Sequence, residues 1–129
     1  MKATGQIVPN FHVDELKCRC GCDAAWISMA FLIKLQELRE AVGEPLHVSS
    51  CCRCLEHNSN VGGVAQSFHL STEKRDCRAI DIHCKTAVLR AKLVYYAQEL
   101  GFNGIGIART FIHLDTRSGE RKIWSYKED

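Results

Sequence analysis

The chain has 129 residues, a length typical of one domain (residues 1–129) with its own hydrophobic core. Its net charge is only +2 and its 17 Lys and Arg residues are scattered, which argues against a nucleic-acid partner. No apolar run reaches the about 18 to 20 residues that a membrane span needs, and residues 1–11 lack the apolar core of a signal peptide. We therefore expect a globular monomer that is synthesised in the cytoplasm.

Eight cysteines are many for a chain of this length. Six fall in two tight groups, within residues 18–22 and 51–54, and the others are Cys77 and Cys84. An even number permits a disulfide framework, the missing secretory signal favours reduced thiols, and clustered cysteines can also bind zinc. The pattern leaves these three alternatives open. We expect some members of the two groups to lie close together, since both could reach one end of the domain.

The first clear element is a helix over residues 29–42, with Ser28 as its N-cap and Gly43 as its stop. A short strand is expected over residues 46–49. Residues 50–67 are rich in Cys, Asn, Ser and Gly and are predicted to form a loop. Its length indicates a functional loop, because long structureless loops in compact domains are often parts of a site.

A strand is predicted over residues 78–83 and a second helix over 87–100, capped by Thr86 and ended by Gly101. Three further strands are expected, over residues 104–107, 111–115 and 122–126, with a hairpin turn at 118–120. These elements predict an α+β domain, in which the helices pack on one face of an antiparallel sheet.

Histidine and carboxylate residues suggest a metal site. A hydrolytic zinc site usually takes three protein ligands and keeps a fourth position for water, and His69, Asp81 and His113 could supply such a set. Strand alternation places Asp115 on the same side as His113. Taken alone this signal is weak, because no short ligand spacing connects the three residues.

The surrounding motifs strengthen the indication of a metal site. Their order closely resembles that of the zinc D-Ala-D-Ala carboxypeptidase and murein endopeptidase family, which has the hedgehog/DD-peptidase fold and includes phage endolysins. The motifs that carry the resemblance are Ser49-Ser50-Cys51-Cys52-Arg53-Cys54-Leu55-Glu56-His57-Asn58, Val61-Gly62-Gly63, Ser67-Phe68-His69, Ala79-Ile80-Asp81-Ile82, Gly104-Ile105-Gly106 and Phe111-Ile112-His113-Leu114-Asp115. The match runs from about Phe11 to Arg117, which is most of the chain.

The resemblance implies a Zn²⁺ cofactor bound by His69, Asp81 and His113. It also implies that Arg53 holds the substrate and stabilises the oxyanion, and that Ser67 supports the site from behind the ligands. The implied activity is hydrolysis of stem or cross-link peptides in peptidoglycan. The phage relatives imply a phage or prophage lytic enzyme, or a virion component, acting at the cell wall.

Two departures from the family pattern matter. The first histidine and the aspartate are usually closer together than His69 and Asp81, which implies an insertion within residues 70–78. By the family's count Asp76 would be the ligand, whereas the local motif favours Asp81, an apolar-flanked strand residue. A Glu or Asp that many members use as general base is replaced by Thr110, so Asp115 is expected to act either as base or as support.

Two alternatives from other classes remain open at this point. One is a non-catalytic zinc or peptide-binding module on the same fold, which the residue at position 110 favours. The other is a cysteine-rich structural protein with incidental histidines. The sequence leaves open which peptidoglycan bond would be cleaved.

Overall fold

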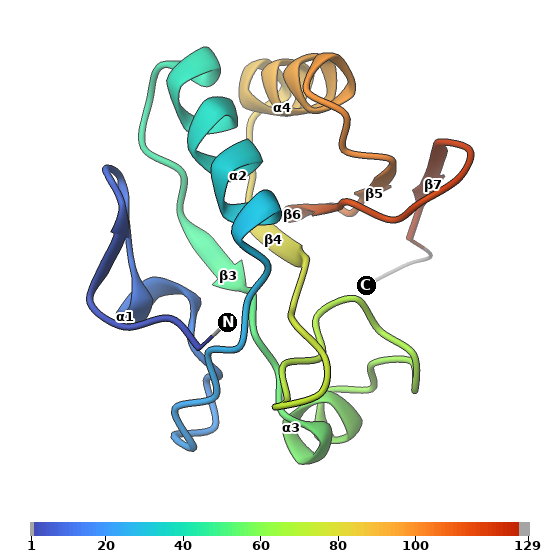
Figure 1. Cartoon of the computed structure of the whole chain (residues 1–129). Helices are drawn as coiled ribbons and strands as arrows, with labels where there is room; N and C mark the ends of the chain where they lie inside the picture. The colour runs from blue at the N-terminus through green and yellow to red at the C-terminus, as the bar shows by residue number, and fades with distance from the viewer. Residues whose placement is uncertain (1, 127–129) are drawn as a thin grey trace.

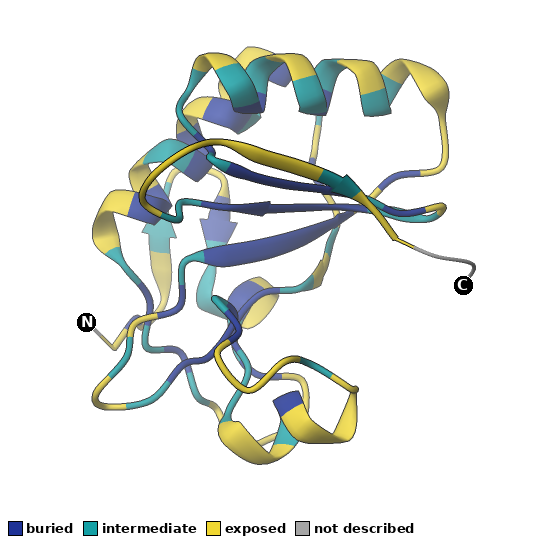
Figure 2. Cartoon of the chain, turned by 90° about the vertical axis from the view of Figure 1, so that its right-hand side faces the viewer, coloured by how far each residue is buried: buried dark blue, intermediate teal, exposed yellow. Residues whose placement is uncertain are grey.

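The computed structural model describes residues 2–126, so residues 1 and 127–129 of the predicted domain lie outside the described residues (Figure 1). Five strands form the main sheet in the spatial order β3-β4-β6-β5-β7. In chain order they are β3 (Val48–Ser50), β4 (Ala79–His83), β5 (Gly104–Ile107), β6 (Phe111–Asp115) and β7 (Lys122–Ser125). Two helices, α2 (Met29–Val42) and α4 (Ala87–Glu99), lie together on one face of this sheet (Figures 1 and 2). The α+β class and the helices on one face are therefore confirmed.

Helix caps explain the bounds of both long helices. The Ser28 hydroxyl accepts a hydrogen bond from the backbone N–H of Phe31, and Gly43 ends α2 in the left-handed conformation at φ 79°. The Thr86 hydroxyl caps α4 in the same way, accepting from the N–H of Leu89. The predicted bounds of α2 are confirmed, and α4 ends one residue earlier than predicted.

Strand alternation divides the residues of the central strands between two environments. The apolar residues Ile80 and Ile82 of β4 belong to the hydrophobic core, as do Ile112 and Leu114 of β6. The intervening residues of these strands point to the opposite face. Asp81 is directly paired with His113 in the antiparallel register of β4 and β6. The sheet therefore presents its polar residues on the face away from α2 and α4.

The pairing of the last strand differs from the prediction. Strand β7 runs parallel to β5, so the sheet is mixed and residues 118–120 do not form a hairpin between neighbouring strands. The reason is that β6 is already paired on both edges, with β4 and with β5. The chain after β6 must therefore cross to the free edge of β5 before it can pair.

Several short elements were not predicted. Residues 50–67 contain a helix, α3 (Leu55–Asn60), in place of a continuous loop. Near the N-terminus, β1 (Gln6–Val8) pairs with β2 (Phe11–His12), which is followed by α1 (Val13–Leu16). Elements this short leave no periodicity to recognise in the sequence. Strand β3 also begins two residues later than expected.

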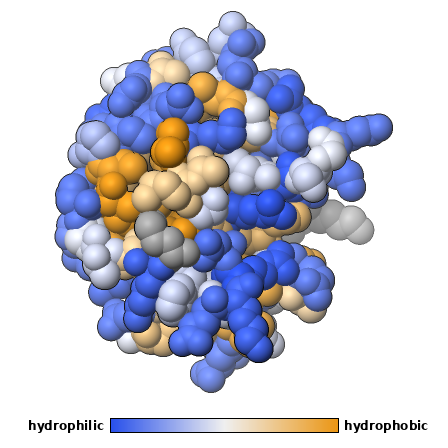
Figure 3. Space-filling view, viewed as in Figure 1, coloured by the Kyte–Doolittle hydropathy of each residue, from blue (hydrophilic) through white to orange (hydrophobic). Residues whose placement is uncertain are grey.

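The segment between β3 and β4 crosses the face of the sheet opposite α2 and α4. In Figure 2 the sheet separates the two long helices from this segment, which carries α3. On the side shown in Figure 3 most side chains are hydrophilic, and apolar ones gather near the beginning of α2, where Met29 and Ile33 are exposed. Among residues 2–126, no helix has the length and apolarity needed to cross a membrane.

Candidate metal centre

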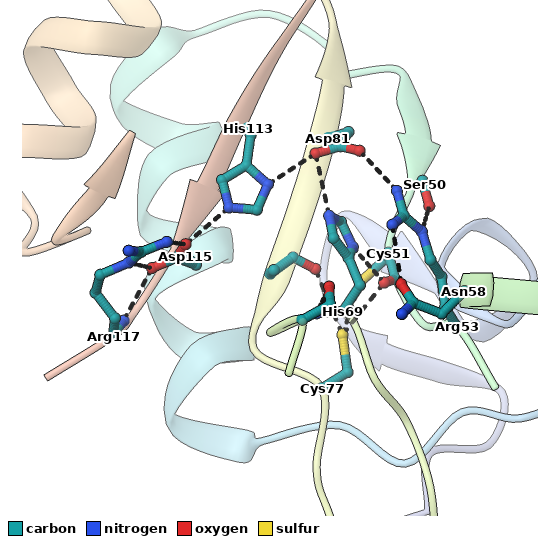
Figure 4. A network of polar contacts seen from close by, with 12 residues as sticks. Ser50, Cys51, Arg53, Asn58, His69, Cys77, Asp81, His113, Asp115 and Arg117 are labelled. Carbon is teal, nitrogen blue, oxygen red and sulfur yellow. Dashed lines mark hydrogen bonds and ion pairs between the residues drawn. The ribbon is translucent and has the colours of Figure 1, made fainter. Parts of the chain in front are cut away.

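Three buried side chains converge where the segment before β4 meets the sheet (Figure 4). His69 comes from that segment, Asp81 from β4 and His113 from β6. The Asp81 Oδ1 atom lies 3.1 Å from His69 Nε2 and 3.0 Å from His113 Nδ1. All three potential ligand atoms lie within 4.8 Å of one another. Two imidazole nitrogens and one carboxylate oxygen form a donor set that suits zinc.

The second nitrogen of each histidine is held by an acceptor. His69 Nδ1 lies 2.7 Å from the carbonyl oxygen of Cys51, and His113 Nε2 lies 2.7 Å from Asp115 Oδ2. These partners favour the tautomers that donate from those nitrogens and turn the other nitrogen's lone pair toward Asp81. Metal-binding histidines in proteins are commonly oriented in this way. The arrangement therefore fits a metal better than a chance meeting of three polar side chains.

Asp115 lies behind His113, away from the solvent. Its side chain is fully buried, and Arg117 donates to both of its oxygens, at 2.9 Å from Nε and 2.7 Å from a terminal nitrogen. Gly104 on the neighbouring strand makes room, because a Cβ at this position would overlap the Asp115 carboxylate. Of the two roles expected for Asp115, base and support, this environment favours support.

Arg53 lies on the other side of Asp81. Its guanidinium donates to Asp81 Oδ2 at 3.2 Å, to the Ser50 hydroxyl at 3.0 Å and to the Asn58 side-chain oxygen at 3.3 Å. Asp81 is thus oriented with one oxygen toward the histidines and the other toward Arg53. Ser67 accepts a hydrogen bond from the backbone N–H of His69 at 3.1 Å, which fits the supporting role expected for it.

Charge pairing shifts the pKa values of the buried groups. Burial alone would raise the pKa of Asp81, but hydrogen bonds donated by His113 and His69 in their protonated forms hold it well below its ordinary value. Burial would lower the pKa of His113, but Asp115 and Asp81 outweigh burial and raise it. A bound metal must displace the proton that these carboxylates favour on His113, so metal affinity falls as the pH is lowered.

The three candidate ligands open onto a pocket of about 500 Å³. Aromatic side chains form much of its wall. Trp124 lies with its ring centre 5.4 Å from that of His113, and Arg117 is stacked between Trp124 and Phe68. The described residues that line the pocket are Arg53, Val61, Gly62, Gly63, Val64, Gln66, Ser67, Phe68, His69, Asp81, Phe111, His113, Arg117, Trp124 and Tyr126.

The alternative ligand Asp76 is not part of the cluster; the carboxylate that meets both histidines is Asp81. Extra residues between His69 and Asp81 are accommodated in a tight turn, in which Thr72 and Arg75 exchange backbone hydrogen bonds. Because this insertion closes on itself, β4 keeps its register with β6. This geometry supports the choice made from the local motif.

An α+β domain with this donor set at an open pocket fits the class of metal-dependent hydrolases. The family model described as Peptidase M15 matches residues 8–115, a range that contains all three candidate ligands. The chain belongs to the peptidase M15 family. No curated protein matches the chain.

Sequence reasoning missed several residues of the site. Arg117 could have been found, because strand alternation places it on the same side as Asp115. Nothing in the sequence pointed to the Cys51 carbonyl, since a residue of any type can supply a backbone acceptor. Trp124 and Tyr126 were assigned to a strand whose position in the sheet was wrong, so their place in the pocket wall was not foreseen.

We expect Asp115→Asn to weaken zinc binding about 10- to 100-fold, the usual cost of losing the partner of a metal-binding histidine. An amide can donate to His113 Nε2, which would favour the tautomer with a proton on Nδ1, the nitrogen that faces Asp81. Competition with a chelator measures the affinity. Asp14→Asn is the matched control, because the Asp14 side chain is 68% exposed. Equal affinities in the two variants would contradict the supporting role.

Proposed function

We propose that the chain is a zinc-dependent peptidoglycan peptidase of the D-Ala-D-Ala carboxypeptidase or endopeptidase type. Its substrates are stem or cross-link peptides of the bacterial cell wall. The observation that carries this proposal is the convergence of His69, Asp81 and His113 on an open pocket, within the range matched by a peptidase family.

Zinc, when bound, lowers the pKa of a water molecule and polarises the scissile carbonyl. The chain's own contribution is to fix the donors. Asp81 and His113 are on paired strands, and His69 is tied to the neighbouring segment by the Cys51 carbonyl. Rigid mounting of this kind keeps the geometry constant through the reaction.

Arg53 is proposed to bind the substrate and to stabilise negative charge on it. A guanidinium has five N–H donors, and three of those on Arg53 are used by Ser50, Asn58 and Asp81. The remaining donors are available to a substrate carboxylate or an oxyanion. Because Arg53 lines the pocket and its side chain is only 14% exposed, these interactions are strengthened by the low local dielectric.

The shape of the pocket is consistent with a short peptide. A volume of about 500 Å³ is in the range of small-molecule sites. The positively charged Arg53 lies near the metal ligands, while Trp124 and Tyr126 offer apolar surface. From the likeness to phage endolysins, we propose in addition that the protein acts at the cell wall as a lytic enzyme or a virion component.

Digestion of purified muropeptides tests this function. Mass spectrometry should detect released D-Ala or cleaved cross-links with the zinc-loaded chain. A chelator should abolish the reaction, and added zinc should restore it. Wild-type protein that is folded and zinc-loaded but cleaves no muropeptide would contradict the proposal.

A second candidate is a non-catalytic module that binds zinc and a peptide. The observation that favours it is that Asp81 is the one carboxylate among the described residues lining the pocket, so no second carboxylate there can act as a base. Asp115 is buried behind His113, and position 110 is a threonine. This candidate predicts saturable muropeptide binding without turnover.

A further inference from the structure

Four cysteines gather at a second place, outside the pocket. Cys18, Cys20 and Cys22 follow α1, while Cys54 is the N-cap of α3. The Sγ atoms of Cys18 and Cys20 are 3.5 Å apart, and those of Cys20 and Cys54 are 3.7 Å apart. All four sulfurs lie within 4.8 Å of one another. The cluster thus joins segments more than 30 residues apart in the sequence.

These separations correspond to metal coordination. A tetrahedron of sulfurs at about 2.3 Å from zinc has sulfur–sulfur edges of about 3.8 Å. A disulfide needs about 2.05 Å, so the sulfurs are placed as neighbours around a common centre and not as bonded pairs. Four thiolates are also the full ligand set of a structural zinc site.

Backbone conformation explains how such closely spaced cysteines converge. In an extended strand, alternate residues would share a face but lie about 6.6 Å apart. Here Gly21 and Asp23 adopt left-handed conformations, with φ 95° and 62°. A hydrogen bond from the Cys18 N–H to the Ala24 carbonyl closes the turn. The tight turn therefore brings three sulfurs to one point, although the spacing is shorter than in common zinc motifs.

Backbone N–H groups also point at two of the sulfurs. The N–H of Cys54 lies 3.4 Å from Cys18 Sγ, and that of His57 lies 3.3 Å from Cys54 Sγ. Such donors stabilise the negative charge of thiolate ligands.

We propose that Cys18, Cys20, Cys22 and Cys54 bind a second zinc ion, in a structural site separate from the His69–Asp81–His113 centre. A second sulfur cluster, formed by Cys51, Cys52 and Cys77, lies in the hydrophobic core. It offers only three sulfurs among the described residues, so we propose no metal there.

The position of this site suggests what it stabilises. Cys54 directly follows Arg53, and the first turn of α3 begins there. A metal at the four sulfurs would fix the start of α3 against the segment after α1, and with it the backbone of Arg53. This positioning role rests on the proposed function, whereas the existence of the site does not.

Metal analysis of the full chain, purified in reductant, tests the site. We expect two zinc ions per wild-type chain and one in each of Cys20→Ser, Cys22→Ser and His113→Ala. Cys20 and Cys22 are exposed, so their replacement leaves the core intact. Cys84→Ser is the control for loss of a cysteine, since Cys84 is buried outside both sulfur clusters, and the folded variant should keep two ions. The proposal would be overturned if the wild-type chain held a single zinc ion and the Cys22→Ser chain retained that ion.

Cobalt gives a second readout that needs no cysteine variant. In the His113→Ala chain, stripped of zinc by a chelator and kept reduced, added Co²⁺ should produce an intense thiolate-to-cobalt charge-transfer band and tetrahedral d–d absorption. Absence of these bands would overturn the proposal, as would disulfides among the four cysteines in the protein purified without reductant. A chain that cleaves no muropeptide would still be expected to bind two zinc ions. The second zinc site and the proposed function can therefore fail independently of each other.

Discussion

Replacing His113 by alanine should remove one zinc ion per chain and abolish peptide cleavage. Two remaining protein ligands, His69 and Asp81, rarely hold zinc against water. Loss of the metal removes both water activation and carbonyl polarisation. The fall in kcat/KM should therefore exceed the about 10²- to 10³-fold that loss of a single oxyanion donor costs.

His83→Ala is the matched control for this variant. His83 ends the same strand that carries Asp81, but its side chain is exposed. It should keep the wild-type zinc content and activity. Zinc analysis together with a muropeptide assay checks both variants, and circular dichroism checks that they fold. A folded His113→Ala chain with full zinc content would contradict the assignment of His113 as a ligand.

Arg53→Ala should retain zinc at saturating metal yet lose about 10²- to 10³-fold in kcat, the scale expected for a donor that stabilises an oxyanion. The metal should remain because the three proposed ligands, His69, Asp81 and His113, are all present. Some zinc affinity should be lost as well, since Asp81 Oδ2 loses the guanidinium that orients it at 3.2 Å. Steady-state kinetics at saturating zinc separates the two effects.

Arg53→Lys tests whether geometry or charge matters. A lysine keeps the charge but cannot reproduce the contacts to Ser50, Asn58 and Asp81, so we expect it to recover only part of the activity. Arg121→Ala is the control for loss of an arginine, because Arg121 is exposed and does not line the pocket. Unchanged kcat in Arg53→Ala would contradict the proposed role.

The elements with strong local signals were predictable from the sequence. Ser28, Gly43 and Thr86 mark helix ends because capping is a local interaction. Alternation identified β4 and β6 because one side of each strand faces the core. The position of β7 was not predictable in this way, since it depends on which strand edges are already paired.

The candidate site was predictable in its residue types but not in its arrangement. The motifs pointed to His69, Asp81 and His113, and the structure brings these three together. Which nitrogen of His113 faces Asp81 depends on Asp115, whose place depends in turn on Gly104. Contacts of this kind arise only when separate strands have assembled.

The cysteines show the same limit. The expectation that members of the two groups lie close together is confirmed for Cys54, which joins residues 18–22. Its neighbours Cys51 and Cys52 instead join Cys77 in the core. Cys51 and Cys52 are buried, whereas Cys54 is the N-cap of α3, so cysteines close in sequence belong to different clusters.

The central claim is that His69, Asp81 and His113 bind a catalytic zinc, and anomalous diffraction at the zinc edge from zinc-loaded crystals tests it most directly. We predict a peak at about 2.0 to 2.2 Å from His69 Nε2, an Asp81 carboxylate oxygen and His113 Nδ1. A peak bound through Asp76 in place of Asp81, or no peak among these three residues, would contradict the account.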